Sequence, residues 1–320
     1  RTIGRELVRM GAEVSVVVPR RAGQAEEEML DGMRVYSFPP TAPWQAAELY
    51  RRCDADIYHS QEPSWGTHVA KRVAPDRKHL ITFRDTRTLG DWWIELSRPS
   101  LSFLQVLGNV LYEDNPLIRG SIRGADGLFC ASEEMVSKAQ RKYHLRSAPT
   151  FLPTPVAIPE RVQKASVPTV CYNARWDRRK RPELFFELAR AFPEVRFLAL
   201  GGSRDAAWES DLRRRFGHLP NLEMVGFVNQ FETDRLWRVL EQSWVLVNTS
   251  AREGLPNAFL EAAAHQCAIL SAVDPDGFAS KFGYHAATDD FEAGLQYLLE
   301  GERWRELGAR ARCHGEEHFE

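Results

Sequence analysis

SAREGLPNAFLEAAAHQCAILS, residues 250–271, is the stretch that decides the fold. It follows the apolar run 244–248, which predicts a buried strand, and it opens with a short loop. A helix is expected to begin near Pro256, because proline is favoured in the first helical turn. The apolar run 268–272 predicts a second strand. Strand, loop, helix and strand in this order are typical of the βαβ unit of a parallel sheet.

The start of this helix is a predicted anion site. The backbone N–H groups of Asn257 and Ala258 have no acceptor within the helix, and with the helix dipole they favour a phosphate. Glu253 lies in the loop and Glu261 eight positions later, so the two carboxylates bracket the helix terminus. Both can accept hydrogen bonds from hydroxyl groups beside a bound diphosphate. Taken alone, the pair is better explained by a solvated loop charge and an exposed helix position, and the surrounding Gly-Leu-Pro-Asn and alanine run favours the anion site instead.

A second basic segment, NARWDRRKRPELF at 173–185, follows the expected strand 169–173. It places Arg175 and Lys180 at the carboxyl end of a strand, where open α/β sheets bind ligands. The rigid fork of arginine and the mobile charge of lysine suit a pyrophosphate whose charge grows as a bond breaks. A solvated basic run is the alternative, because three more arginines crowd the same loop, namely Arg178, Arg179 and Arg181.

The alternation of strands and helices continues over the whole chain and predicts two β/α domains. In the first half, strands are expected at 14–18, 34–38, 56–59, 79–83 and 127–131, and helices at 44–52, 66–73 and 133–143. The second half adds strands at 196–200 and 222–225 and helices at 183–192, 206–216, 233–242 and 258–266. The proline-rich stretch 153–168 is the expected linker, since proline disrupts sheets and long helices. We therefore place the domains at 1–155 and 156–320.

Composition narrows the classes of function. The chain has 320 residues, 43% of them hydrophobic and 27% charged, which is ordinary for a globular protein. A net charge of −2 provides no global field for nucleic acid. Five scattered cysteines read as reduced thiols of a cytoplasmic protein. No apolar run reaches the roughly 20 residues that span a bilayer.

The first and last helical patterns, near 3–10 and 304–318, start and stop without caps, which predicts truncation at both ends.

In their order along the chain these motifs resemble the family-4 retaining glycosyltransferases. Three features of the second half match: Arg175 with Lys180, the segment MVGFV at 224–228, and Glu253 with Glu261. The first half resembles the acceptor domain more weakly, through DIYHSQEP, LITFRD and RGADGLFCASEEM. The resemblance implies the GT-B fold, two Rossmann-like domains whose parallel sheets face each other across a cleft.

The same resemblance implies a role for each matched residue. Arg175 and Lys180 would bind the diphosphate of a nucleoside-diphosphate sugar, which is a donor substrate and not a cofactor. Glu253 would contact the transferred sugar and Glu261 the ribose. Gly254 belongs to the same loop, the amides of Asn257 and Ala258 would hold phosphate, and the backbone at Phe227 and Val228 would line the base. Transfer would retain the anomeric configuration and need no metal.

The acceptor side departs from the family. Members commonly place a histidine after the strand that here reads LITFRD, where this chain has Arg84 and Asp85. Arg84 could bind an anionic acceptor and Asp85 a hydroxyl, and a surface ion pair is the alternative. The acceptor is a glycan, a lipid-linked molecule or a small molecule, and nucleic acid is not an expected partner. Five basic residues allow peripheral contact with anionic lipid at the inner membrane face: Arg119, Arg123, Lys138, Arg141 and Lys142.

Other functions stay open. A binding subunit that keeps the donor pocket without acceptor chemistry would explain Arg84. A sugar-nucleotide epimerase of the same fold would need its own acid and base. An NAD-linked oxidoreductase is disfavoured, because no GxGxxG follows a strand. His59 and His68 flank Glu62 without zinc spacing, so a structural role is favoured over a metal site.

Overall fold

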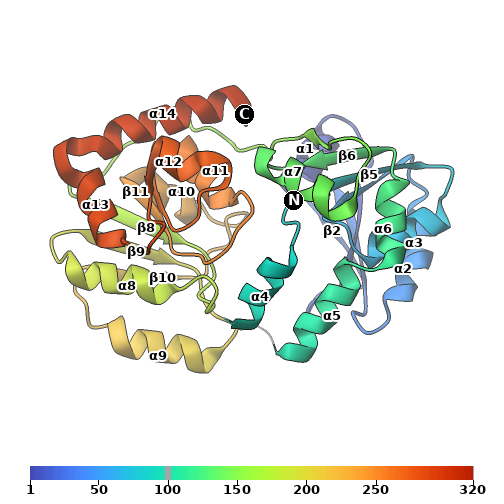
Figure 1. The fold of residues 1–320 in the computed structure, drawn as a ribbon, viewed down its shortest axis with the longest axis horizontal. Helices are drawn as coiled ribbons and strands as arrows, with labels where there is room; N and C mark the ends of the chain where they lie inside the picture. The colour runs from blue at the N-terminus through green and yellow to red at the C-terminus, as the bar shows by residue number, and fades with distance from the viewer. Residues whose placement is uncertain (98–101, 320) are drawn as a thin grey trace. The chain divides into compact units, whose positions relative to one another are not determined.

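A computed structural model describes residues 1–97 and 102–319 of the chain, which form two compact units (Figure 1). Unit 1 consists of Arg1–Thr86 and Leu104–Pro155, and unit 2 of Arg87–Phe103 and Val156–Glu320. Residues 152–168 contain no helix or strand, as their prolines predicted. No helix in the described ranges is both long and apolar enough to cross a membrane.

Unit 1 begins with a three-stranded sheet in the order β1-β3-β2. Strands β1 (Ser15–Pro19) and β3 (Met33–Phe38) are parallel, whereas β2 (Glu27–Leu30) is antiparallel to β3. The hairpin turns through Asp31 and Gly32, both with positive φ, which is the usual conformation of a two-residue turn. Strand β2 is thus an antiparallel addition that the sequence analysis did not include. The helices of this part are α1 (Thr2–Arg9), η1 (Pro43–Gln45) and α2 (Ala46–Cys53).

The second sheet of unit 1 is parallel throughout, in the order β4-β5-β6-β7. Its strands are β4 (Ile57–Gln61), β5 (Lys78–Phe83), β6 (Gly127–Cys130) and β7 (Thr150–Phe151). The accompanying helices are α3 (Trp65–Val73), α5 (Phe103–Glu113), α6 (Pro116–Arg123) and α7 (Glu133–Tyr143). Apolar side chains of β5, α6 and α7 form one buried core, among them Ile81, Phe83, Ile118 and Tyr143.

Unit 2 is built on a six-stranded parallel sheet in the order β10-β9-β8-β11-β12-β13, with helices on both faces (Figure 1). The strands are β8 (Thr169–Asn173), β9 (Arg196–Leu200), β10 (Leu222–Gly226), β11 (Val245–Asn248), β12 (Ala268–Ser271) and β13 (Gly283–His285). The helices are α8 (Pro182–Ala191), α9 (Ala206–Phe216), α10 (Arg235–Gln242), α11 (Asn257–Ala264), η2 (Pro275–Gly277), α12 (Phe278–Phe282), α13 (Phe291–Leu299), η3 (Glu300–Glu302) and α14 (Arg303–His318). The central strands are buried on both faces, which explains their continuous apolar runs.

One segment lies where the sequence did not place it. Helix α4 (Leu89–Ser97) belongs by position to the first domain of the sequence analysis, yet it packs in unit 2. The physical reason is electrostatic, because Asp91 and Glu95 of α4 meet buried arginines of unit 2. Such a long-range pairing leaves no periodic pattern in the sequence.

Candidate active site

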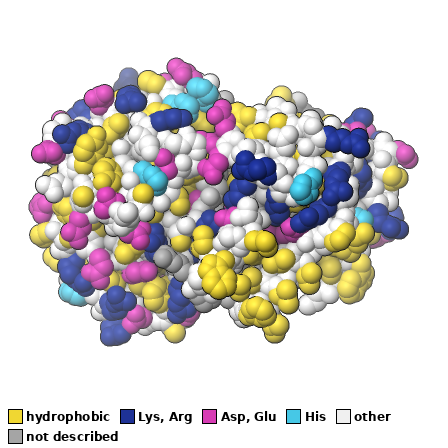
Figure 2. All heavy atoms as spheres, in the orientation of Figure 1, with side chains coloured by type: hydrophobic (Ala, Val, Ile, Leu, Met, Phe, Trp, Pro, Cys, Tyr) yellow, Lys and Arg dark blue, Asp and Glu magenta, His cyan; other side chains and the backbone are white. Residues whose placement is uncertain are grey.

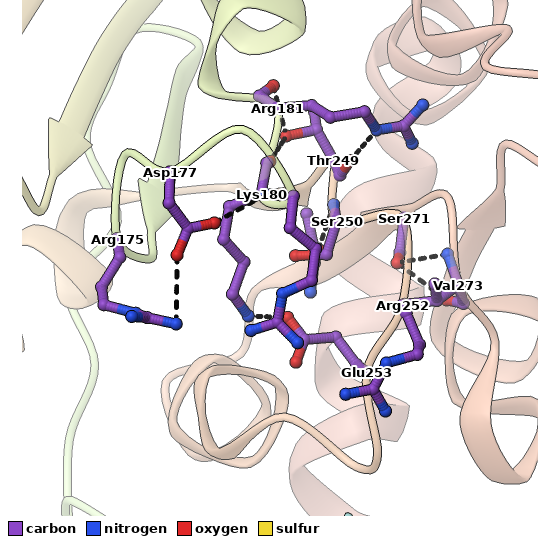
Figure 3. A network of polar contacts seen from close by, with 12 residues as sticks. Arg175, Asp177, Lys180, Arg181, Thr249, Ser250, Arg252, Glu253, Ser271 and Val273 are labelled. Atoms are coloured by element: carbon purple, nitrogen blue, oxygen red, sulfur yellow. Dashed lines mark hydrogen bonds and ion pairs between the residues drawn. The ribbon is translucent and has the colours of Figure 1, made fainter. Parts of the chain in front are cut away.

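Two loops leave neighbouring strands at the same edge of the sheet of unit 2. β8 and β11 are parallel and adjacent, so the loop 174–181 and the loop 249–256 emerge side by side. Hydrogen bonds join the two loops (Figure 3). Thr249 donates its hydroxyl to the carbonyls of Lys180 and Arg181, 2.6 and 2.8 Å away, and Ala251 N–H donates to Arg179 O at 3.0 Å. The two loops therefore form one rigid edge.

Lys180 and Glu253 meet at this edge. Lys180 Nζ forms an ion pair with Glu253 Oε1, and the two side chains keep only 13% and 14% of their exposed surface. In Figure 3 both side chains point toward each other from their separate loops. The alternative of a solvated loop charge does not hold for Glu253. Removing a charged pair from water is costly unless the partners hold each other, as they do here.

Arg175 lies in the same loop but is more open to solvent. Its Nη2 is 3.0 Å from Asp177 Oδ2, with 54% of the arginine side chain exposed. Asp177 Oδ1 also accepts the N–H of Lys180 at 3.1 Å. The carbonyls of Arg175 and Lys180 lie 3.3 and 3.2 Å from the hydroxyl of buried Tyr172. The loop thus presents one exposed guanidinium and one nearly buried ammonium.

Helix α11 begins at Asn257, immediately after Pro256, as the sequence predicted. Within the described chain no acceptor is bonded to the N–H of Asn257 or Ala258, which leaves both for an anion. Glu261 lies one turn further on and accepts a hydrogen bond from Asn173 Nδ2 at 3.2 Å. Burial raises the pKa of Glu261 to about 7, and the side chain of Gln230 partly opposes this. Gly254 lies half-buried between Glu253 and the helix start.

Phe227 and Val228 follow β10, two strands away from β8. Phe227 is 82% exposed, so its ring packs little against the rest of unit 2. The neighbouring Gly201 is required by close approach: a Cβ there would lie 1.9 Å from Ala174 O, and its φ is +119°. Gly201 N–H donates to Gly226 O at 2.8 Å. This glycine ties the loop of Arg175 to the end of β10, and the sequence analysis missed it although GGS follows a strand.

Arg179 and Arg252, one in each of these loops, are buried and pair with acidic side chains of α4. Arg179 Nη1 is 2.8 Å from Glu95 Oε1, and Arg252 Nη2 is 3.5 Å from the same oxygen. Arg252 Nε also lies 3.9 Å from Asp91 Oδ1. All four side chains are nearly buried. A solvated basic run was the alternative considered for this segment, and the burial of Arg179 against α4 excludes it for this residue.

Unit 1 holds the predicted acceptor residues. Arg84 and Asp85 follow β5, and both of their backbone N–H groups donate to Glu62 Oε2, at 2.6 and 2.8 Å. Burial raises the pKa of Glu62 to about 7, opposed by these two hydrogen bonds. The role of Glu62 was not foreseen. A signal was available, because a carboxylate directly after a β-strand lies at the ligand edge of a parallel sheet.

The remaining candidates are structural. His59 Nε2 lies 2.7 Å from Thr82 Oγ1, and burial lowers its pKa. His68 Nδ1 is 3.0 Å from Ser121 Oγ. No cluster of three His, Cys, Asp or Glu side chains suited to a metal occurs in the described part of the chain. Of the five basic residues considered for lipid contact, Arg119 and Lys142 both pair with Asp114, at 2.7 and 3.2 Å.

Family models match both halves of the chain. Residues 1–158 match Glycosyltransferase Family 4, and residues 157–305 match Glycosyl transferases group 1. No curated protein matches.

Solved structures of glycosyltransferases share this fold. Sucrose-phosphate synthase from Thermosynechococcus elongatus aligns with a TM-score of 0.76 at 16% identity, over 100% of this chain and 88% of that one. Anabaena HepE in complex with UDP-glucose gives 0.68 at 10% identity, over 96% of each chain. The pneumococcal O-GlcNAc transferase GtfA, in complex with UDP and GlcNAc, gives 0.63 at 12% identity, over 94% of this chain and 61% of that one. At these identities the likeness concerns the fold.

Proposed function

The chain belongs to the GT-B glycosyltransferases that join a Family 4 domain to a group 1 domain, and on this premise we propose that it is a retaining transferase using a nucleoside-diphosphate sugar. Unit 2 binds the donor and unit 1 the acceptor. Two of the similar structures were determined with UDP or a UDP-sugar, which favours uridine as the base to test first.

The ion pair between Lys180 and Glu253 carries this proposal. In a nucleotide sugar, a single C–O–P linkage joins the sugar to the diphosphate. A residue that contacts the transferred sugar must therefore lie next to a residue that contacts the diphosphate. Glu253 and Lys180 meet this requirement although 73 positions separate them.

The other donor contacts follow from the same geometry. The free amides of Asn257 and Ala258, with the dipole of α11, hold phosphate oxygens beside Lys180. Arg175 leaves Asp177 and adds a second cation. Glu261 accepts hydrogen bonds from the ribose hydroxyls. The backbone of Phe227 and Val228 lines the base at the end of β10.

The leaving diphosphate gains negative charge as the sugar departs. Lys180 and the start of α11 are held in place beside that charge, which is how a preorganised site lowers the barrier, and Arg175 joins them when it leaves Asp177. We propose that they act without a bound metal. Full transfer activity after exhaustive chelation supports this, and activity that returns only with added divalent metal contradicts it.

The cellular location is proposed from the cysteines and from one exposed apolar helix. The five free cysteines fit the reducing cytoplasm. Apolar side chains are exposed along α5, where they gather on the face shown in Figure 2: Phe103, Leu104, Leu107 and Leu111. We propose this helix for peripheral membrane contact, which a vesicle flotation assay with Leu104→Glu tests directly.

The experiment that tests the function has two stages. First, a thermal-shift screen of the full chain against UDP, GDP and ADP and their sugars identifies the base, because a ligand of the folded state raises the melting temperature. Second, the best donor is incubated with an acceptor panel, and the product's anomeric configuration is read by NMR. Retention supports the proposal and inversion contradicts it. Donor binding without any transfer would favour the binding-subunit alternative, and conversion of the donor sugar without an acceptor would favour an epimerase.

A further inference from the structure

Arg84 is a half-buried cation whose guanidinium bonds only to neutral oxygen atoms. Nε donates to Gln61 Oε1 at 3.0 Å and Nη2 to Thr154 Oγ1 at 3.1 Å. Among the described residues, no carboxylate forms an ion pair with this guanidinium. Arg77 and Arg119 of the same unit each pair with an aspartate within 3.0 Å. Arg84 therefore differs from a surface arginine in an ion pair, which was the alternative considered for it.

The partners of Arg84 come from different strands of one sheet. Gln61 ends β4, Arg84 directly follows β5, and Thr154 lies three residues after β7. Because β4, β5, β6 and β7 are parallel, these positions share the carboxyl edge of the sheet. Ligands of open α/β sheets bind beyond this edge. Arg84 thus lies where unit 1 is expected to bind its substrate.

The position of Arg84 is held by Glu62. Glu62 has a φ of +78°, in the left-handed region that side chains with a Cβ rarely adopt. Backbone strain of this kind persists only where surrounding contacts impose it. The contacts here are the two hydrogen bonds from the N–H groups of Arg84 and Asp85 to Glu62 Oε2. They fix the backbone from which the guanidinium extends.

The charge of Arg84 is incompletely compensated. Burial lowers its pKa, and the charge of Glu62 opposes this only in part. Burying a charged guanidinium without an anionic partner costs free energy, because the group loses hydration. An oxyanion that binds beside it would offset this cost. Its planar fork also matches the two oxygens of a phosphate or carboxylate.

We propose that Arg84, with Gln61 and Thr154 as its orienting partners, binds an oxyanion carried by the acceptor. The acceptor class is then a sugar or polyol that bears a phosphate or a carboxylate. This inference rests on the proposed function and specifies the substrate of the same transferase. It assigns the acceptor-side charge to a residue in the position where the family commonly has a histidine.

Direct binding provides the first test. The full chain is saturated with the nucleoside diphosphate that the thermal-shift screen identifies among UDP, GDP and ADP, so that the donor site is occupied. It is then titrated with inorganic phosphate while binding is followed by NMR. Wild type should bind phosphate, and Arg84→Gln should bind it about 10- to 100-fold more weakly, the loss expected when a charged hydrogen bond is removed. Arg84→Lys should lie between them. Arg123→Gln, an exposed arginine at the end of α6, is the matched control and should equal wild type.

Acceptor selectivity provides the second test. Glucose, glucose 6-phosphate and glucuronate are compared as acceptors or as inhibitors of transfer, and the preferred oxyanion identifies phosphate or carboxylate as the natural group. The preference of wild type for one anionic ligand over glucose should vanish in Arg84→Gln. Equal phosphate affinity in wild type and Arg84→Gln, or a wild type that favours neutral glucose, overturns the inference. Absence of binding to UDP, GDP and ADP alike would instead remove the proposed function, so the two failures are distinguishable.

Discussion

The carboxylate of Glu95 lies 2.8 Å from the guanidinium of Arg179, although 84 positions separate the two residues in the chain. The same carboxylate is 3.5 Å from Arg252. Arg179 directly precedes Lys180, and Arg252 directly precedes Glu253. One buried carboxylate on α4 thus contacts both loops of the proposed donor site, at the residues next to Lys180 and Glu253.

Replacing Glu95 by Gln should leave two buried guanidinium groups without their shared counter-charge. Removal of one partner from a buried ion pair typically costs about 3–5 kcal/mol. We expect a loss of this size in urea-induced unfolding, with weaker UDP binding because the loops lose their support. Glu48→Gln is the control, since that side chain is 77% exposed in its pair with Arg51. A stability equal to wild type would show that α4 does not hold the loops.

Replacing Gly201 by Ala tests the link between the Arg175 loop and the end of β10. A Cβ at this position would overlap Ala174 O and would require a φ of +119°. We expect a loss of about 2 kcal/mol or more, because strained backbone and steric overlap add. Gly120→Ala is the matched control. Nothing lies within 4 Å of its added Cβ, and alanine in the interior of α6 should stabilise by about 1 kcal/mol. Thermal unfolding of both variants gives the comparison.

The pKa of Glu261, raised by burial to about 7 from an ordinary 4.5, makes stability depend on pH. The folded state holds the proton more tightly than the unfolded state. The contribution to stability is therefore complete below pH 4.5 and is lost as pH rises through 7. Relative to wild type, Glu261→Gln should gain stability between pH 5 and 8, by up to about 3 kcal/mol. Parallel stability curves for the two proteins would refute this.

Replacing both Arg175 and Lys180 by Ala should abolish most of the donor affinity. Hydrogen bonds to charged groups contribute about 1.5–3 kcal/mol each, so calorimetric UDP affinity should fall at least 100-fold. Uridine, which lacks the diphosphate, should bind both proteins equally weakly. Arg178→Ala, in the same loop but paired with Asp205 at 3.7 Å, is the control. Unchanged UDP affinity in the double variant would contradict the assignment of the diphosphate site.

Local signals in the sequence predicted the strands and the helix that surround the candidate donor site. The apolar runs of β8 and β11, the proline before α11 and the basic residues after β8 each encode a structure within a few residues. Because β8 and β11 are parallel neighbours, the loops that follow them lie at the same edge of the sheet. Lys180 of one loop can therefore meet Glu253 of the other. These elements were predictable because burial and capping depend on neighbours in the chain.

What the sequence did not show depends on contacts between distant residues. Glu95 on α4 looked like an ordinary helix charge, and only its pairing with Arg179 places the helix in unit 2. Glu62 was considered only as part of a weak metal pattern, because its hydrogen bonds to Arg84 and Asp85 cross 22 and 23 positions. Strand β2 alternates exposed and half-buried residues over four positions, too few for a reliable period.

The substitution Glu253→Gln, with UDP affinity and sugar transfer measured on the same sample, tests the central claim most directly. Glutamine has nearly the same shape, and Lys180 is released from its ion pair, so UDP should bind at least as tightly as to wild type. Transfer should fall at least 100-fold, the order of loss found when one charge-stabilising group is removed from an active site. Wild-type transfer by this variant would contradict the account.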